Sequence, residues 1–346
     1  MAAFHPLTVA AVERLTDEAV AVTLAVPPAL RPAYDFAAGQ HVTLRLPSGQ
    51  DRRSYSICAP AGSGVLRVAI KRIPAGTFSC RDWRAGEVVE VLPPTGRFTT
   101  AFDPGRARHY GFVAAGSGIT PVLSLLATAL AVEPASRVSL VYGNRTSTSV
   151  MFLDELADLK DRWPDRVHLV HVLSRETGEA EVLNGRLDAG RLQAILAALV
   201  PVSGVDEWFV CGPYGVVTAA EGVLASLGVP AASVHTELFH VEEPGPAAVQ
   251  PVAQGAHEVT VLQDGRATTV ATGPDETVLD AALRVRPDLP YACKGAVCST
   301  CRARVVSGEV RMARNYALEP EEVRQGYVLT CQSRPLTDSV TVDYDA

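Results

Sequence analysis

The sequence Tyr291-Ala-Cys293-Lys-Gly-Ala-Val-Cys298-Ser-Thr-Cys301 places three cysteines in the spacing C-x4-C-x2-C, and Leu329-Thr-Cys331-Gln supplies a fourth cysteine further along. This spacing is typical of thiolate ligands to a [2Fe–2S] cluster, because one tight loop offers three ligands and a later segment brings the fourth. The residues between the cysteines are mostly small, which allows backbone N–H groups to turn toward the sulfur atoms. We therefore predict Cys293, Cys298, Cys301 and Cys331 as metal ligands.

A structural zinc site and scattered free thiols are the alternatives for these cysteines. Structural zinc sites usually combine two C-x2-C pairs in a tetrahedral arrangement. Only one such pair, Cys298 and Cys301, occurs here, and it lies within the longer pattern. The spacing therefore favours the iron–sulfur interpretation.

The bulk composition describes a globular protein of two or three domains. The chain has 346 residues, 47% of them hydrophobic and 20% charged, and a formal net charge of −7. The negative charge argues against a nucleic-acid partner, which needs a basic surface. The start of the chain shows no signal-peptide pattern, and no apolar run is long enough to span a membrane. Cys58, Cys80 and Cys211 show no disulfide framework, so we expect a cytoplasmic protein.

The first hundred residues have the pattern of antiparallel strands. The segments 41–46 and 65–72 alternate apolar and polar residues, which is typical of half-buried strands. Glycine and proline separate these segments. We predict a small antiparallel β-barrel over residues 1–104.

From residue 105 the pattern changes to alternating strands and helices. The predicted strands are 109–114, 138–142, 167–172 and 207–210, and the predicted helices are 121–130, 152–159, 190–199 and 214–227. Such alternation predicts a parallel sheet covered on both faces, here over residues 105–240. Residues 241–256 are rich in proline, alanine and glycine and are interpreted as a linker. Residues 257–346 then form a third domain, with a hairpin around Asp264-Gly265, a helix at 277–285 and a last strand at 339–343.

Two motifs in the first two domains could bind phosphates and planar rings. Gly116-Ser-Gly118-Ile-Thr-Pro121 lies between a predicted strand and a predicted helix, where glycines and a helix N-terminus can receive a pyrophosphate. Arg53-Ser54-Tyr55-Ser56 offers a guanidinium for phosphate, a phenol ring for a flat heterocycle and hydroxyls for a ring nitrogen. Gly76-Thr77-Phe78-Ser79 could add further donors. Taken alone, each motif could equally be an ordinary turn, strand edge or loop.

Cys211-Gly212-Pro213 ends the fourth predicted parallel strand. A free cysteine there could be core packing or could sit beside a reacting ring, but no histidine or other base supports a nucleophile. The chain has no H-E-x-x-H pair and no G-x-S-x-G elbow, so hydrolase interpretations have no support.

Together these motifs resemble, in kind and order, the ferredoxin–NADP reductase-like flavoproteins that carry a C-terminal plant-type ferredoxin domain. The stretch Asn315–Glu322, followed by Gly326-Tyr-Val-Leu-Thr-Cys331-Gln, is similar to the reductase subfamily that serves phenylacetyl-CoA 1,2-epoxidase, a multicomponent oxygenase. The resemblance covers essentially the whole chain. It implies a flavin-binding β-barrel, an α/β nucleotide-binding domain and a β-grasp ferredoxin domain.

The resemblance also implies roles for individual residues. Those implied at the flavin and the hydride-transfer site are Arg53, Ser54, Tyr55, Ser56, Gly76, Thr77, Phe78, Ser79, Cys211, Glu237 and Phe239, with Ser56, Cys211 and Glu237 next to the reacting rings. Those implied at the nicotinamide nucleotide are Gly116, Gly118, Thr120, Arg145, Ser174 and Arg175, the last three near the 2′-phosphate of NADPH. Ala75 stands where many relatives have glycine, which puts the detailed geometry of the 76–79 loop in question.

The predicted function is electron transfer from NADPH, or NADH, through FAD and a [2Fe–2S] cluster to a di-iron oxygenase. A nicotinamide delivers two electrons as hydride, whereas the cluster accepts one electron at a time, so a flavin between them is required. One alternative keeps this order but serves a steroid or ring-hydroxylating oxygenase, with FMN replacing FAD in some such reductases. A second alternative, from another class, is a non-catalytic ferredoxin-type electron carrier.

Overall fold

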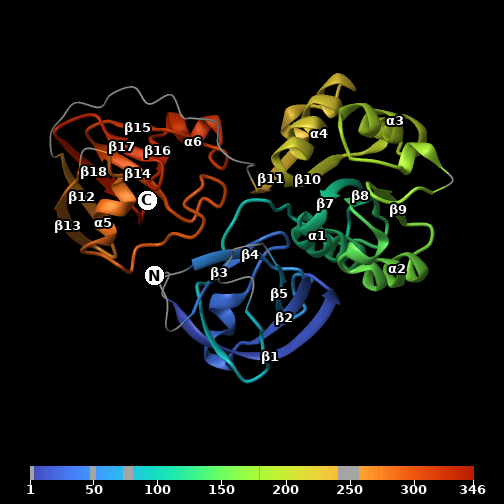
Figure 1. The fold of residues 1–346 in the computed structure, drawn as a ribbon, viewed down its shortest axis with the longest axis horizontal. Helices are drawn as coiled ribbons and strands as arrows, with labels where there is room; N and C mark the ends of the chain where they lie inside the picture. The colour runs from blue at the N-terminus through green and yellow to red at the C-terminus, as the bar shows by residue number, and fades with distance from the viewer. Residues whose placement is uncertain (1–3, 47–51, 73–80, 179, 241–256, 274) are drawn as a thin grey trace. The chain divides into compact units, whose positions relative to one another are not determined.

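The computed structural model describes residues 4–46, 52–72, 81–178, 180–240, 257–273 and 275–346 (Figure 1). The chain forms two compact units. The larger unit contains the described residues between 4 and 46 and between 55 and 240, and the smaller contains those from 257 onward together with residues 52–54. None of the helices in the described ranges has the length and apolar composition that crossing a bilayer requires.

A six-stranded antiparallel sheet in the order β4-β3-β6-β1-β2-β5 forms the N-terminal part. Its strands are β1 (His5–Thr16), β2 (Ala19–Ala25), β3 (His41–Arg45), β4 (Arg52–Ser56), β5 (Leu66–Lys71) and β6 (Val88–Val91). An antiparallel bridge between Ile57, just after β4, and Val68 of β5 brings the two ends of the sheet together. Alternate residues such as Val22, Val42 and Val68 point inward and are fully buried. This closure agrees with the predicted barrel.

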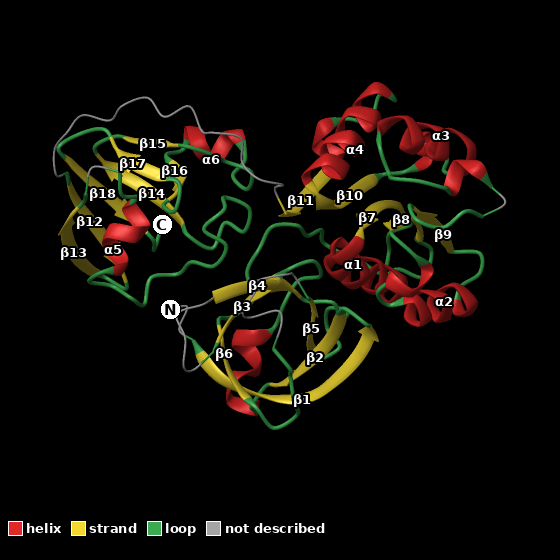
Figure 2. Ribbon diagram, viewed as in Figure 1, coloured by secondary structure: helices red, strands yellow, loops and turns green. Residues whose placement is uncertain are grey.

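A five-stranded parallel sheet in the order β11-β10-β7-β8-β9 follows. Its strands are β7 (His109–Ala115), β8 (Arg137–Asn144), β9 (Val167–Leu173), β10 (Glu207–Pro213) and β11 (Val234–His240). Its helices are α1 (Ile119–Val132), α2 (Leu153–Arg162), α3 (Ala189–Leu199) and α4 (Tyr214–Ser226). Phe112 of β7 packs with α1 and α2, whereas its neighbour Val113 packs with α3 and α4. Figure 2 shows the sheet between these two pairs of helices.

The smaller unit contains a five-stranded sheet in the order β13-β12-β18-β14-β16. Its strands are β12 (Glu258–Gln263), β13 (Arg266–Ala271), β14 (Arg302–Ser307), β16 (Tyr327–Leu329) and β18 (Ser339–Asp343), and β15 (Val310–Met312) pairs separately with β17 (Ser333–Pro335). Helices α5 (Val278–Leu283) and α6 (Pro320–Arg324) complete the unit. The β12–β13 turn has Asp264 and Gly265 at φ 54° and 68°, as the predicted Asp-Gly hairpin requires.

The multidomain fold predicted from the sequence is confirmed. Differences in individual elements include two strands and the start of one helix. The sequence pattern did not identify β1 or β11 as strands, although β11 adds the last parallel strand beside β10. Most residues of β1 are exposed or half-buried, so its apolar alternation is weak. Helix α1 begins at Ile119 and not at Pro121, because a single 3₁₀ turn at Gly116–Gly118 leads directly into it.

Candidate functional site

The cysteine loop of the smaller unit has a strained backbone. Lys294, Ala296 and Ser299 have left-handed φ values of 49°, 68° and 49°, three of the five non-glycine residues in the described part of the chain with positive φ. Such residues cost about 1–2 kcal/mol each, so the surrounding structure must hold them. Alternating left-handed residues turn successive N–H groups to one side, which forms a concave site for negative charge. Gly295, which could adopt this conformation freely, does not have positive φ.

The four predicted ligands lie together as two pairs. Cys293 and Cys298 lie close enough for each thiol to shift the pKa of the other, and the same holds for Cys301 and Cys331. The N–H of Gly295 donates to Sγ of Cys293 at 3.3 Å. The thiol of Cys298 lowers the pKa of Cys293 to about 6, and the thiol of Cys301 lowers the pKa of Cys331.

This arrangement fits the donor set of a [2Fe–2S] cluster, in which each of two irons takes two thiolates. Within the described residues no three His, Cys, Asp or Glu side chains converge on a point where one metal ion would bind. The four cysteines would hold the cluster. When bound, the cluster supplies a one-electron acceptor; the chain supplies thiolates and N–H donors that stabilise its negative charge.

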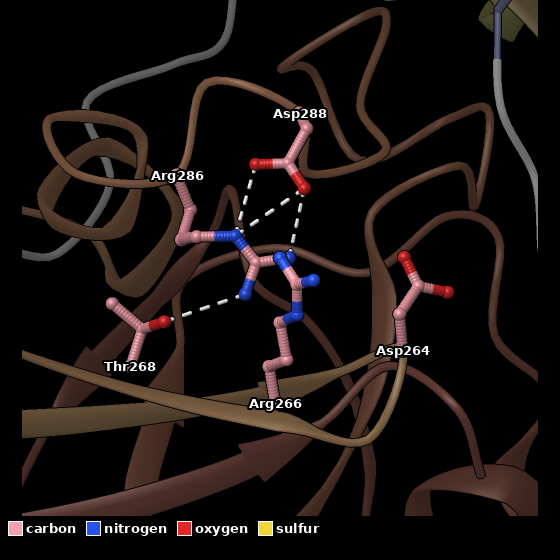
Figure 3. A pocket seen from close by; sticks show the side chains of 5 residues that line it. All are labelled: Asp264, Arg266, Thr268, Arg286 and Asp288. Carbon is pink, nitrogen blue, oxygen red and sulfur yellow. Dashed lines mark hydrogen bonds and ion pairs between the residues drawn. The ribbon is translucent and has the colours of Figure 1, made fainter.

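The chain segment that leads into the cysteine loop is anchored by Arg286 (Figure 3). Its guanidinium donates to both carboxylate oxygens of Asp288 at 2.8–3.3 Å and to the hydroxyl of Thr268 on β13 at 3.3 Å. It also donates to Oε1 of Gln263 on β12 at 3.2 Å. Arg286, Asp288 and Thr268 line a hollow of about 620 Å³ together with Asp264 and Arg266. The anchor ties residues 286–288 to the β12–β13 hairpin, five residues before Cys293.

In the larger unit, the candidate nucleotide site lies at the carboxyl end of β7. Gly116 has φ 54° and begins the 3₁₀ turn before α1. A Cβ on Gly118 would lie 2.2 Å from the carbonyl oxygen of Cys211, so only glycine allows the loop to approach β10 this closely. Both predicted glycines are therefore required by geometry, one by its backbone conformation and the other by space.

Two carbonyl groups of this loop accept hydrogen bonds from side chains of the protein. The hydroxyl of Tyr142 donates to the carbonyl of Gly116 at 2.9 Å, and the hydroxyl of Thr120 donates to that of Ser117 at 3.0 Å. Because C=O and N–H point in opposite directions across a trans peptide, fixing these carbonyls directs the following N–H groups the other way. Thr120 was predicted as a nucleotide ligand; in the structure its hydroxyl supports the loop.

Ser56, Cys211 and Glu237 come together from three strands. Cys211 on β10 is directly opposite Glu237 on β11. The hydroxyl of Ser56 lies 3.5 Å from Oε2 of Glu237, which is a long contact for a hydrogen bond. Cys211 is fully buried, and burial raises the pKa of its thiol well above the usual value, with a further contribution from the Glu237 carboxylate. The thiol therefore stays protonated at neutral pH.

Arg145, Ser174 and Arg175 lie at the carboxyl ends of β8 and β9. The N–H of Ser174 donates to the carbonyl of Asn144 at 2.9 Å, and the N–H of Arg175 donates to that of Arg145 at 2.8 Å. These bonds continue the parallel ladder past the two strands, so the two arginines stand on adjacent chain segments. The structure thus brings together the residues predicted to bind the 2′-phosphate.

Only some of the remaining residues predicted to bind the flavin lie within the ranges that the structure describes. Arg53, Ser54 and Tyr55 lie on β4, and the guanidinium of Arg53 donates to the carbonyl of Arg52 at 2.8 Å. Phe239 on β11 is half-buried against the core that contains α1. Gly76, Thr77, Phe78 and Ser79, with Ala75 and Cys80, lie outside the described residues.

Lys71 was missed by the sequence analysis. It ends β5, and its Nζ lies 4.0 Å from the position that a Cβ on Gly116 would take. Burial lowers the pKa of Lys71, and the nearby Arg145 lowers it further. A cation at a strand end, just before the 76–79 loop, was the available signal in the sequence.

Comparison with known proteins agrees with both sites. Residues 261–336 match the family described as "2Fe-2S iron-sulfur cluster binding domain", and residues 112–222 match "Oxidoreductase NAD-binding domain". The chain belongs to the ferredoxin reductase-like family of oxygenase reductase components. In these proteins electrons pass from a nicotinamide nucleotide through FAD to a [2Fe–2S] cluster.

Individual relatives narrow the comparison. The chain is 46% identical to one of the subunits of 1,2-phenylacetyl-CoA epoxidase from Escherichia coli, over 100% of this chain and 99% of that protein. It is 36% identical to the ferredoxin reductase component of 3-ketosteroid-9-alpha-monooxygenase from Rhodococcus rhodochrous, over 98% and 96% of the two chains. The solved structure of phthalate dioxygenase reductase shares the fold, with a TM-score of 0.62 and 24% identity over 98% of both chains.

Proposed function

We propose that this protein is the reductase component of a phenylacetyl-CoA 1,2-epoxidase and delivers electrons to its di-iron oxygenase subunits. The observation that carries the proposal is the 46% identity to the Escherichia coli epoxidase protein over the full length of both chains. The steroid monooxygenase reductase, which is 36% identical to this chain, supports the same order of electron carriers with a different recipient. The proposed domains are residues 1–104 for FAD, 105–240 for the nucleotide and 257–346 for the cluster, joined by a linker at 241–256, in a cytoplasmic protein.

The residues of the larger unit would bind and orient the two rings that exchange hydride. Flavin, when bound, accepts a hydride and releases its two electrons singly to the cluster. Arg53, Ser54, Tyr55 and Phe239 would position it, with Gly76, Thr77, Phe78 and Ser79 along its pyrophosphate. Ser56, Cys211 and Glu237 would line the contact with the nicotinamide. The protonated thiol of Cys211 adds no charge there, so Glu237 would supply the negative charge that favours a cationic oxidised nicotinamide.

NADPH is the proposed electron donor. Arg145 and Arg175 on neighbouring strand ends would pair with the 2′-phosphate, which is dianionic near neutral pH. Lys71 lies beside Gly116 and would neutralise part of the pyrophosphate charge at the turn before α1. NADH lacks the 2′-phosphate, so it would lose the arginine contacts but keep those to Lys71 and the glycine turn.

Reconstitution tests the recipient. The purified reductase, NADPH and the oxygenase subunits of the Escherichia coli phenylacetyl-CoA epoxidase are combined, and NADPH-dependent epoxide formation from phenylacetyl-CoA is measured. In a parallel arm the oxygenase component of the steroid monooxygenase is supplied with its own substrate. We expect at least about tenfold faster turnover in the first arm. Faster turnover in the second arm would assign the protein to steroid oxygenation, and NADPH oxidation in neither arm would favour a plain electron carrier.

A further inference from the structure

The side chain of Asn315 organises a turn in the smaller unit. Its Oδ1 accepts from the N–H of Leu318 at 2.8 Å and from the N–H of Ala317 at 3.2 Å. Its Nδ2 donates to the carbonyl of Leu318 at 2.8 Å. One amide side chain thus satisfies three backbone groups, and residues 315–318 are held in one conformation without regular secondary structure.

The same turn is fixed at its far end. Leu318 is 6% exposed and packs in the core that also contains Ala296, Cys301 and Cys331. Helix α6 then begins with a capping box between Glu319 and Glu322. The turn is therefore rigid where it meets the cysteine loop.

A hydrogen bond connects the turn to the cysteine loop. The N–H of Tyr316 donates to the carbonyl of Ala296 at 3.2 Å. Ala296 is 1% exposed and has φ 68°, a conformation that an alanine does not keep without support. Ala296 itself packs beside Cys301 and Cys331, two of the predicted ligands. The contacts thus run from Asn315 through the Tyr316 N–H and Ala296 to a proposed cluster ligand.

We propose that Asn315 is a positioning residue for the cluster: it holds the Tyr316 N–H on the Ala296 carbonyl and so keeps Ala296 in the left-handed conformation that turns the N–H groups of the loop toward the ligand sulfurs. The inference rests on the four cysteines being the cluster ligands. Without the Asn315 bonds, the turn loses its fixed shape, and Ala296 can relax toward negative φ. The N–H groups that the left-handed residues turn inward then rotate away from the ligand sulfurs.

The expected consequence is a change in redox behaviour. An N–H donor to a ligand sulfur stabilises the reduced cluster more than the oxidised one, because the reduced form carries more negative charge. Loss of this donor makes the reduction potential more negative. It also loosens the loop and speeds the loss of iron to a chelator. Glycine at position 296 accepts φ 68° without support, so it should remove the need for Asn315.

The experiment uses the full-length protein and four variants: Asn315→Ala, Ala296→Gly, the double variant and Asn184→Ala. Asn184 is a matched control, since its amide closes a turn with Gly178 through two bonds of 2.8 Å in the larger unit. Iron and acid-labile sulfide content, the midpoint potential from an EPR-monitored titration, and the rate of iron loss to a chelator are measured.

We expect Asn315→Ala to have a more negative potential and at least about threefold faster iron loss, and Asn184→Ala to match the wild type. The double variant should return to the values of Ala296→Gly. If Asn315→Ala is purified without iron, recovery of iron in the double variant supports the inference, and no recovery overturns it. Wild-type potential and iron loss in Asn315→Ala overturn it as well. Wild-type protein without iron would refute the cluster ligands themselves.

Discussion

The glycine turn before α1 and the cysteine loop are both backbone sites for negative charge, but they reach positive φ differently. In the turn, the left-handed residue is Gly116, which adopts φ 54° at no steric cost. In the loop, the left-handed residues are Lys294, Ala296 and Ser299, all of which carry a Cβ. The turn therefore reaches its left-handed conformation without strain, whereas the left-handed residues of the loop need the support of contacts with residues distant in sequence.

The difference predicts how each site fails. A substitution inside the glycine turn should act directly and locally, in proportion to the clash or strain that it introduces. The cysteine loop should respond to changes outside itself, and to the presence of the cluster, because four ligand bonds would hold the same strained backbone. The following predictions run from the largest expected effect to the smallest.

Removing one ligand should separate the two sites most sharply. In Cys301→Ala, the cluster cannot be held by its full set of thiolates, and iron and sulfide content should fall close to zero. NADPH-dependent reduction of cytochrome c should drop by more than about 100-fold, since even changes around a ligand amount to 10- to 100-fold. Flavin reduction by NADPH, followed by stopped-flow absorbance, should stay within about twofold, because this step needs only the larger unit. Equal loss of both activities would show that the two sites are not separable.

Gly118→Ala tests the steric requirement of the turn. The added Cβ would lie 2.2 Å from the carbonyl oxygen of Cys211, a backbone atom that cannot move aside. Overpacking of this kind costs about 1–3 kcal/mol, so NADP⁺ binding measured by calorimetry should weaken by roughly 10- to 100-fold. Gly215→Ala is the matched control, since nothing lies within 4 Å of its Cβ position at the start of α4. The affinity of Gly215→Ala for NADP⁺ and its thermal stability should equal or exceed those of the wild type.

Much of the glycine turn and of the cysteine loop could be predicted from the sequence, because short sequence patterns specify both. The C-x4-C-x2-C spacing predicted the ligands, and Gly116 and Gly118 predicted the turn. The role of Tyr142 and the chain of contacts through Asn315 could not be predicted, because their partners lie on other strands or loops, and for Lys71 the sequence offered only its place at a strand end. The bond from the Thr120 hydroxyl to the Ser117 carbonyl could not be predicted either, because only the folded turn determines it, and a contact of Thr120 with the nucleotide stays a prediction.

Arg175→Ala tests whether a residue outside the glycine turn determines the preference for NADPH over NADH. One charge-assisted contact to the 2′-phosphate is removed, so the KM for NADPH should rise by about tenfold. The KM for NADH should not change, because NADH has no 2′-phosphate. Arg186→Ala is the control for loss of one positive charge in the same unit and should leave both values unchanged. An unchanged ratio of the two KM values in Arg175→Ala would remove Arg175 from the proposed 2′-phosphate site.

Gly116→Ala should have a smaller effect than Gly118→Ala although the two glycines belong to one turn. Only the Lys71 Nζ, at 4.0 Å, lies near the added Cβ, so the change introduces strain at φ 54° and no clash. Left-handed alanine costs about 1–2 kcal/mol, part of which is offset by the lower entropy of the unfolded chain. We expect NADP⁺ to bind roughly three- to fivefold more weakly. A loss as large as that of Gly118→Ala would mean that Gly116 is also constrained by space.

The smallest expected effect is a pH dependence that arises from Cys211 on β10, the strand that the glycine turn contacts. Burial and the Glu237 carboxylate raise the pKa of the Cys211 thiol well above its usual value, so the folded protein keeps this proton when the unfolded chain has lost it. The proton count is then higher in the folded state at alkaline pH, and this group lowers stability as pH rises above about 9. Between pH 6.5 and 8 the thiol is protonated in both states. The rate of flavin reduction by NADPH should therefore show no ionisation of Cys211 in that range. The free energy of unfolding, measured with urea, should fall less in Cys211→Ala than in the wild type only above about pH 9. A thiol-dependent step near pH 7, absent from Cys211→Ala, would show that the buried thiol ionises and that the turn packs against a charged group.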